Sequence, residues 1–146
     1  SVPQRRPAPA VCIVPARDEA DHVAALVLAR MLPGPEYDAR VSPFPLLAAE
    51  MLDFVGEKGC RVACISAMPP GAAVHAAYLA KRLKQRFPEL RLLVALWTSE
   101  NADRARARLR EAGVDQVATS LGEAIEQLRQ LALPVTLELQ RKPQPA

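Results

Sequence analysis

The stretch that most constrains the fold is Val11–Glu19, which reads Val-Cys-Ile-Val-Pro-Ala-Arg-Asp-Glu. It is a short apolar run, stopped by a proline and followed by acidic residues at the head of a segment rich in Ala, Val and Leu. Consecutive apolar residues are typical of a strand that is covered on both faces. Acidic side chains favour the positive end of a helix dipole. The stretch therefore predicts a buried parallel strand that leads directly into a helix.

The same strand-then-helix unit recurs along the chain. Strands are expected at residues 11–14, 37–41, 61–65, 90–96 and 116–118, and helices at residues 18–32, 46–57, 72–87, 101–112 and 121–131. The second strand alternates with polar residues, which is typical of a sheet edge. Five such units predict an α/β fold with a five-stranded parallel sheet in the flavodoxin-like order 2-1-3-4-5. Right-handed crossovers then place helices on both faces of the sheet.

The periodicity of two predicted helices indicates which side chains face the core. In the first helix, the residues expected to face inward are Ala20, Val23, Val27 and Met31. In the third helix they are Val74, Tyr78 and Leu79.

The two ends of the chain differ in composition from the middle. Residues 1–9 hold three prolines and two arginines and are expected to form an extended linker towards an upstream region, because the chain begins with Ser. Residues 10–132 form the predicted domain. In the tail, residues 133–146, Val135, Leu137 and Leu139 alternate with other residues, which favours an added strand or a docking segment. A homodimer through this tail or through the helix at 101–112 is an open alternative.

Composition excludes several classes of protein. The 146 residues carry a net charge of only +3, and aromatic residues make up 4% of the chain, which disfavours nucleic-acid binding. No apolar run is long enough to span a membrane, and no signal peptide is visible. We therefore expect a cytoplasmic domain, at the cytosolic face of the inner membrane if a missing upstream segment tethers it. Cys12, Cys60 and Cys64 are expected to be buried reduced thiols without a metal.

The carboxyl ends of the strands are the expected ligand site, because ligands of open α/β sheets bind there. The loops at this edge are residues 15–19, 66–71 and 97–100. The candidate ligand-binding residues in or beside these loops are Arg17, Asp18, Glu19, His22, Ser66, Met68, His75, Trp97, Ser99 and Thr119.

Each of these residues also has a purely structural interpretation. Acidic residues at a helix start are what the helix dipole favours in any case. The Ser66 hydroxyl either donates to a ligand or satisfies backbone groups. Trp97 either stacks on a flat ligand or covers the sheet edge.

Several motifs of catalysis are missing from the sequence. It contains neither a Gly-x-Gly-x-x-Gly loop nor a Walker motif, and its two histidines, far apart, allow no nucleophile–base pair to be argued. Response-regulator receivers need an aspartate at the end of strand three and a lysine after strand five, and here Ser66 and Thr119-Ser120 occupy those places. An enzyme and a phosphoryl acceptor are both disfavoured. The arginines at 104, 106, 108 and 110 form a solvated face or contact an acidic lipid or protein.

Three stretches resemble the cobalamin (vitamin B12)-binding flavodoxin-like domain over nearly all of residues 11–131. They are the Arg-Asp-Glu-Ala-Asp-His start of the first helix, Ile-Ser-Ala-Met after strand three, and Ala-Gly-Val-Asp-Gln-Val followed by Leu-Gly-Glu-Ala. Base-off members of that family carry Asp-x-His-x-x-Gly in the first loop, where the histidine ligates cobalt. One register places Asp18 at the aspartate but Ala20 at the histidine and Val23 at the glycine.

Shifting the register by two keeps His22 as the histidine and loses the aspartate and the glycine, so His22 is a metal ligand only in that register. The family's serine is retained as Ser66. Its Gly-Gly after strand four is replaced by Ala95-Leu96, whose side chains should crowd the nucleotide tail of the cofactor. The resemblance implies a degenerate member of the family, with no cofactor expected and cobalamin as the alternative.

The segments Pro-Ala-Arg-Asp-Glu-Ala-Asp and Ile-Ser-Ala-Met-Pro-Pro also look like the soluble C-terminal extension of some bacterial autoinducer-2 exporter-like membrane permeases. These observations lead to a first hypothesis of a non-enzymatic ligand-sensing or regulatory domain, whose partner is a small molecule or a neighbouring protein module. The alternative is a genuine cobalamin or corrinoid-binding domain. A small hydrolase or transferase ranks last.

Overall fold

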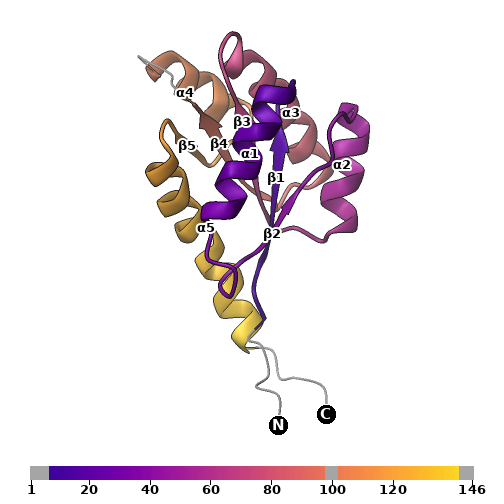
Figure 1. Ribbon diagram of the computed structural model, residues 1–146, viewed down its shortest axis with the longest axis vertical. Coiled ribbons are helices and arrows are strands. Elements are labelled where there is room, and N and C mark those ends of the chain that lie inside the picture. Colours follow the sequence, from indigo (N-terminus) through magenta and orange to yellow (C-terminus); the bar gives the residue numbers. More distant parts are fainter. Residues whose placement is uncertain (1–6, 98–101, 142–146) are drawn as a thin grey trace.

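The five-stranded parallel sheet predicted from the sequence is present in the computed structural model, which describes residues 7–97 and 102–141. In chain order the elements are β1 (Ala10–Pro15), α1 (Glu19–Met31), β2 (Asp38–Val41), α2 (Ala48–Glu57), β3 (Val62–Ala67), α3 (Ala72–Arg86), β4 (Arg91–Leu96), α4 (Asp103–Glu111), β5 (Gln116–Ala118) and α5 (Leu121–Arg141). The strand order is β2-β1-β3-β4-β5, and every neighbouring pair is parallel. Helices cover both faces of the sheet (Figure 1). The predicted fold and strand order are confirmed.

The central strands are apolar on both faces because each face is covered by helices. Val11 and Ile13 of β1 belong to the core beneath α1 and α5, and Cys12 and Val14 belong to the core beneath α2 and α3. All four side chains are inaccessible to solvent. Successive side chains of a strand point to opposite faces, so a run of four apolar residues supplies two cores at once.

The buried face of α1 is not the one predicted. Val23, Val27 and Met31 are 52%, 49% and 54% exposed, whereas Ala25 and Leu28 are fully buried. The side chain of Asp18 caps the helix at the backbone of Asp21, and Asp21 returns a bond to the Asp18 backbone, so this capping box fixes where the helix starts. Asp21 also accepts the backbone N–H of Met68, which ties this side of the helix to the loop after β3. The helix is apolar on two sides, and periodicity alone selected the wrong one.

A similar correction applies to α3. Leu79 is buried as predicted, but Val74 and Tyr78 are exposed. The side that meets the sheet is built largely from alanines, including Ala76 and Ala80. Leu79 and Leu83 are buried among these small side chains, whereas Val74 and Tyr78 lie on the outer side of the helix.

The strand predicted for the tail does not exist, because α5 continues as one helix to Arg141. Leu128, Ala132 and Val135 are buried at helical spacing, so the apparent alternation in this segment is part of a helical pattern. The helix contains Pro134, which removes one backbone donor. Residues 1–6 of the predicted linker and residues 142–146 lie outside the described residues. No helix in the described ranges is both long and apolar enough to cross a membrane.

Two of the three cysteines form a disulfide, which corrects the prediction of three reduced thiols. Cys12 in β1 and Cys60 just before β3 are bonded, with Cα atoms 6.0 Å apart. They are 48 residues apart in sequence, and only the pairing of β1 with β3 brings them together. Cys64 is free and buried on the opposite face of the sheet.

We expect a thiol count to reveal this pairing. Burial raises the pKa of the Cys64 thiol to about 12, so at pH 8 the thiol is protonated and shielded. A disulfide reagent that releases a chromophore should therefore detect no thiol in the native chain. It should detect one after unfolding, and three after unfolding with a reductant. More than one thiol in the unfolded, unreduced chain would contradict the disulfide.

Candidate functional site

A buried carboxylate, Asp21, lies at the edge that the sequence predicted to bind a ligand. Its side chain is on the first turn of α1, and the residue is 2% exposed. One carboxylate oxygen accepts the backbone N–H groups of Arg17 at 2.9 Å and Asp18 at 3.0 Å. The other accepts the backbone N–H of Met68 at 2.6 Å. A single side chain thus fastens the loop after β1 to the loop after β3.

Asp21 was absent from the predicted site residues. Its signal in the sequence is the spacing of three between Asp18 and Asp21, the spacing of a capping box at the start of a helix. That spacing identifies the local bonds of Asp21, but not its bond to Met68 in a distant loop.

The Ser66 hydroxyl is the second member of this cluster. It donates to the backbone oxygen of Asp21 at 2.8 Å and accepts the indole N–H of Trp97 at 2.7 Å. Ser66 is fully buried, and Trp97 is almost so. These contacts are the ones expected from the structural interpretation of both residues. The Ser66 hydroxyl satisfies a backbone group, and Trp97 is buried at the edge of the sheet.

These bonds close the seam between β1 and β3. Besides the contacts of the Asp21 and Ser66 side chains, the backbone N–H of Ala16 donates to the backbone carbonyl oxygen of Ser66 at 2.9 Å. The carboxylate accepts three bonds, and the hydroxyl is used both as donor and as acceptor. The arrangement holds the loop after β1 and the loop after β3 in a fixed position. We call the cluster of Asp21, Ser66 and Trp97 the seam cluster.

The other predicted site residues lie around the seam cluster in different positions. Arg17 and His75 meet at the exposed rim, where a guanidinium nitrogen is 3.2 Å from the imidazole Nε2. His22 is half-buried, and its ring stacks on Phe44, with ring centroids 5.5 Å apart. Glu19 is exposed on the first turn of α1.

Two further candidates lie after the last strands. Thr119 follows β5 and is half-buried, and Ser99 lies outside the described residues. Among residues 7–97 and 102–141, no group of three or more His, Cys, Asp or Glu side chains is arranged to hold a metal ion.

The residues present do not fit a histidine-ligated cobalamin. Asp18 accepts the backbone N–H of Asp21 and does not orient a histidine. Ser66 is engaged on both sides, and the side chains of Ala95 and Leu96 at the end of β4 are buried in the two cores. The seam is therefore filled by the chain's own groups.

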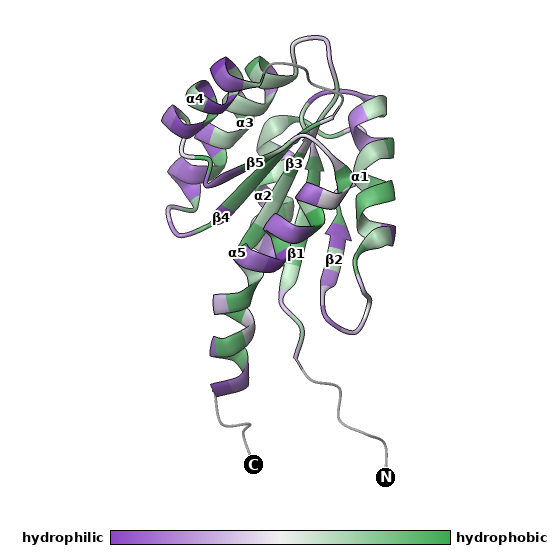
Figure 2. Cartoon of the chain, turned by 90° about the vertical axis from the view of Figure 1, so that its left-hand side faces the viewer, coloured by the Kyte–Doolittle hydropathy of each residue, from purple (hydrophilic) through white to green (hydrophobic). Residues whose placement is uncertain are grey.

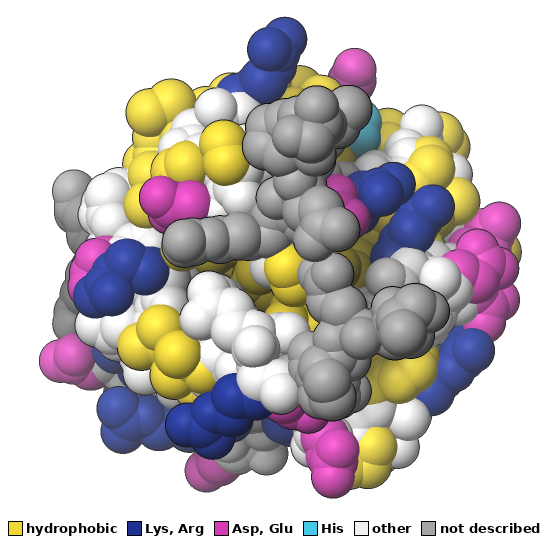
Figure 3. Space-filling view, turned by 90° about the horizontal axis from the view of Figure 1, so that it is seen from below, with side chains coloured by type: hydrophobic (Ala, Val, Ile, Leu, Met, Phe, Trp, Pro, Cys, Tyr) yellow, Lys and Arg dark blue, Asp and Glu magenta, His cyan; other side chains and the backbone are white. Residues whose placement is uncertain are grey.

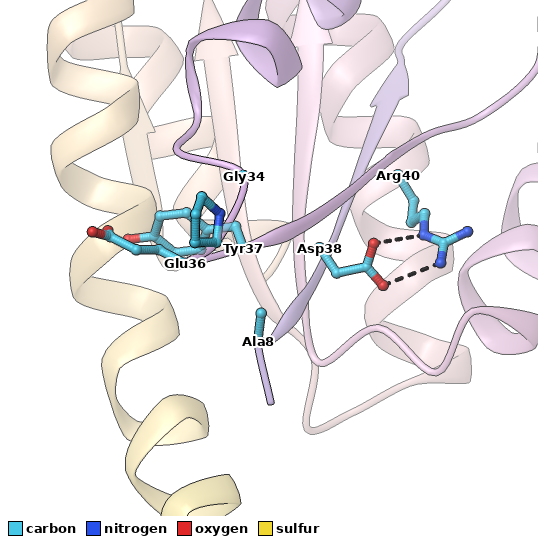
Figure 4. A pocket seen from close by; sticks show the side chains of 7 residues that line it. Ala8, Gly34, Glu36, Tyr37, Asp38 and Arg40 are labelled. Carbon is cyan, nitrogen blue, oxygen red and sulfur yellow. Dashed lines mark hydrogen bonds and ion pairs between the residues drawn. The ribbon is translucent and has the colours of Figure 1, made fainter. Parts of the chain in front are cut away.

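A cavity of about 990 Å³ lies at the opposite edge of the sheet, near the amino end of β1 (Figure 4). Its lining includes Tyr37, Asp38 and Arg40, and burial raises the pKa of the Tyr37 phenol. Asp38 and Arg40 bind each other at 2.8 Å, and Glu36 points away from them. Seen from this end, charges of both signs are interspersed (Figure 3). The cavity lacks the convergent polar groups of a small-molecule site.

We expect Trp97→Phe to reduce the free energy of unfolding by about 1 kcal/mol, because it removes the indole donor to Ser66 and keeps a ring on the sheet edge. Urea unfolding followed by circular dichroism measures this. In a Ser66→Ala background the same change should cost much less, since the acceptor is already absent. Equal losses in both backgrounds would contradict the hydrogen bond.

The fold and the seam define a flavodoxin-like α/β domain. No protein-family model matches the chain, and no curated protein is similar enough in sequence to match it. Solved structures do share its fold. One is a cobalamin-binding protein from Desulfitobacterium hafniense DCB-2, with a TM-score of 0.67 and 9% sequence identity. The match covers 85% of this chain, which spans 59% of the length of that protein.

Receiver-type structures share the fold as well. A CheY-like protein from Pseudomonas aeruginosa PAO1 has a TM-score of 0.58 and 15% identity over 92% of this chain and 98% of that one. A CheY-like response regulator receiver domain protein from Methanospirillum hungatei JF-1 has a TM-score of 0.59 and 12% identity, over 94% of this chain and 100% of that one. The TM-scores establish a common fold, and at sequence identities this low the similarity extends to the fold alone.

Proposed function

We propose that this is a non-enzymatic regulatory domain that acts through contacts with a neighbouring protein module. The observation that carries the proposal is that the chain's own side chains close the seam between the carboxyl ends of β1 and β3. Asp21 and Ser66 lie where a ligand of this fold would bind, and their polar groups already bond to the chain itself. A domain of this kind acts through its surface and not through a ligand in the seam.

The end of β3 supports the proposal. Receivers need an aspartate there, and this chain has Ser66, whose hydroxyl is buried and bonded on both sides. Thr119 follows β5, where receivers need a lysine. These substitutions remove the phosphoryl acceptor and its cationic partner but leave the scaffold intact.

Exposed apolar side chains on the helices also support a contact domain. Val23, Val27 and Met31 follow one another along the outer side of α1, and Val74 and Tyr78 are exposed on α3. Figure 2 shows α1 as mostly hydrophobic. Exposed apolar surface of this kind often marks a protein interface.

The second candidate function is corrinoid binding. The fold shared with a cobalamin-binding protein favours it. In this alternative His22 would supply the cobalt ligand in the shifted register of the motif.

One titration separates the two candidates. The purified chain is mixed with hydroxocobalamin, with adenosylcobalamin, or with Mg²⁺ and beryllium fluoride, and then passed through gel filtration. We expect no retained visible absorbance and no change in the amide NMR spectrum around the loops after β1 and β3. A retained cobalamin spectrum that His22→Ala abolishes would replace our proposal with the second candidate. A response to beryllium fluoride would favour a receiver that still binds a phosphoryl analogue.

The attached module and the location are part of the same proposal. The resemblance to the C-terminal extension of permeases favours a membrane transport protein as the neighbour, with this domain at the cytosolic face. The Cys12–Cys60 disulfide weighs against that location, because disulfides are rare in the cytosol. Protease accessibility in spheroplasts of the source cells tests it: a cytosolic domain is cleaved only after the inner membrane is opened.

A further inference from the structure

Positive charge is concentrated on two adjacent helices, α3 and α4. Together they carry eight Lys and Arg residues and two Asp and Glu residues, for a net charge of +6. The whole chain has a net charge of +3, so the remaining residues carry −3. The protein is therefore strongly basic on one pair of helices and mildly acidic elsewhere.

A concave surface lies between these two helices, with a volume of about 650 Å³, which we call the α3–α4 groove. Its lining consists of Val74, Ala77, Tyr78, Lys81, Arg108, Glu111 and Ala112. Ala77 and Ala112 are buried where the helices meet, and their small side chains leave the depression. Val74 and Tyr78, which also line the groove, are one helical turn apart on α3.

Tyr78 is held in place although it is 60% exposed. A guanidinium nitrogen of Arg82 donates to its hydroxyl at 3.2 Å, and the guanidinium carbon lies 5.7 Å from the ring centroid. An exposed aromatic side chain that is already oriented loses little conformational entropy when a partner binds.

The cations that line the groove have no acidic partner within the described part of the chain. Lys84, Arg86 and Arg106 form ion pairs, but Lys81 and Arg108 form none there. These two exposed side chains lie on opposite helices and flank the apolar floor. An occupant with an apolar stripe between acidic side chains would complement both features.

We propose that the α3–α4 groove binds an acidic amphipathic helix of a protein partner. The proposal rests on the proposed function and names the kind of contact that the regulatory domain makes. The one-turn spacing of Val74 and Tyr78 matches the spacing of apolar anchors on a helix laid along the groove. Glutamates beside that stripe pair with Lys81 and Arg108. A flat anionic membrane fits less well, because the surface is concave and Glu111 is part of its lining.

Binding can be measured with a designed probe. The probe is a fluorescein-labelled helical peptide with leucine at i, i+4 and i+7 and glutamate on both flanks, and the control peptide carries lysine in place of glutamate. We expect the full 146-residue chain to bind the acidic peptide with a dissociation constant on the order of 10 μM. The basic peptide should not bind. Amide NMR shifts should cluster on α3 and α4.

Charge reversal locates the site. Arg108→Glu and Lys81→Glu should each weaken binding by about tenfold, and Tyr78→Ala should do so by a similar factor. Arg30→Glu is the matched control, because Arg30 is an exposed cation on α1, and it should change binding by less than about twofold. These side chains are exposed, and circular dichroism verifies that each variant is folded.

Three results would overturn the proposal. They are no saturable binding of the acidic peptide, equal weakening by Arg30→Glu and Arg108→Glu, and preferential binding to phosphatidylserine vesicles over phosphatidylcholine vesicles without peptide binding. Self-association that Arg108→Glu abolishes would make a second copy the occupant and would also overturn it. The cobalamin and beryllium fluoride titration is a separate measurement, so failure of the proposed function is distinguished from failure of the groove.

Discussion

Asp21→Ala should lower the free energy of unfolding by about 3–4 kcal/mol. The substitution removes an acceptor of three backbone N–H groups in a residue that is almost fully buried, and bonds to a charged acceptor are stronger than neutral ones. It also removes the bond from the Met68 backbone N–H, one of the contacts that hold the loop after β1 to the loop after β3. Urea unfolding followed by circular dichroism and by the fluorescence of Trp97 measures the loss.

Two other variants act as controls for this prediction. Asp21→Asn retains one oxygen acceptor and should fall between the wild type and Asp21→Ala. Asp18→Ala removes only an exposed helix cap and should cost about 1 kcal/mol. If Asp21→Ala costs no more than Asp18→Ala, the seam cluster does not hold the two loops together.

Reduction of the Cys12–Cys60 disulfide should lower the free energy of unfolding by about 4 kcal/mol. The bond closes a loop across a sequence separation of 48 residues, and the chain-entropy model gives this value for a loop of that length. Guanidinium unfolding with and without a reductant measures the difference. Cys64→Ala should respond to the reductant like the wild type, and Cys60→Ser should not respond. A reductant effect of similar size in Cys60→Ser would contradict the assignment.

The result also bears on where the protein works. In the cytosol the thiol pair would be kept reduced, and the protein would have the stability of the reduced chain. In an oxidising compartment it would have the full stability. Measuring the oxidation state of Cys12 and Cys60 in cells, after rapid alkylation, therefore tests the expected cytoplasmic location.

The fold could be predicted because its signals are local. Each strand is a short apolar run followed by a helix with its own start and stop signals, and the weak alternation of residues 37–41 identified β2 as the edge. Because the crossovers between parallel strands are right-handed, five such units can be arranged in a sheet in only a few ways. The strand order follows from these facts without knowledge of any side-chain contact.

The buried faces of α1 and α3 could not be read from periodicity because both helices are apolar on two sides. Val27 and Leu28 are adjacent in sequence and equally apolar, yet only Leu28 is buried. In α1 the buried side also carries Asp21, whose carboxylate binds the loop after β3, and in α3 the buried side is made largely of alanines. These are features of packing, and a hydrophobic pattern does not contain them.

The contacts at the edge predicted to bind a ligand could be read from the sequence only in part. Ser66 and Trp97 were recognised individually, and their bond to each other joins residues 31 positions apart. Asp21 is not among the candidate residues because an acidic residue in the first turn of a helix has an ordinary explanation. The disulfide between Cys12 and Cys60 could not be predicted either, because the two residues are 48 positions apart in sequence. In each case the missing information is which loops the sheet brings together.

The two ends of the described chain lie beside each other. Pro7 and Gln140 line the same small cavity, so the segment that leads into β1 lies close to the C-terminal end of α5. A domain with neighbouring ends can be spliced into a surface loop of a host protein without forcing the host's own chain apart. It can also be circularly permuted with a short linker, which would allow new termini to be opened away from α3 and α4.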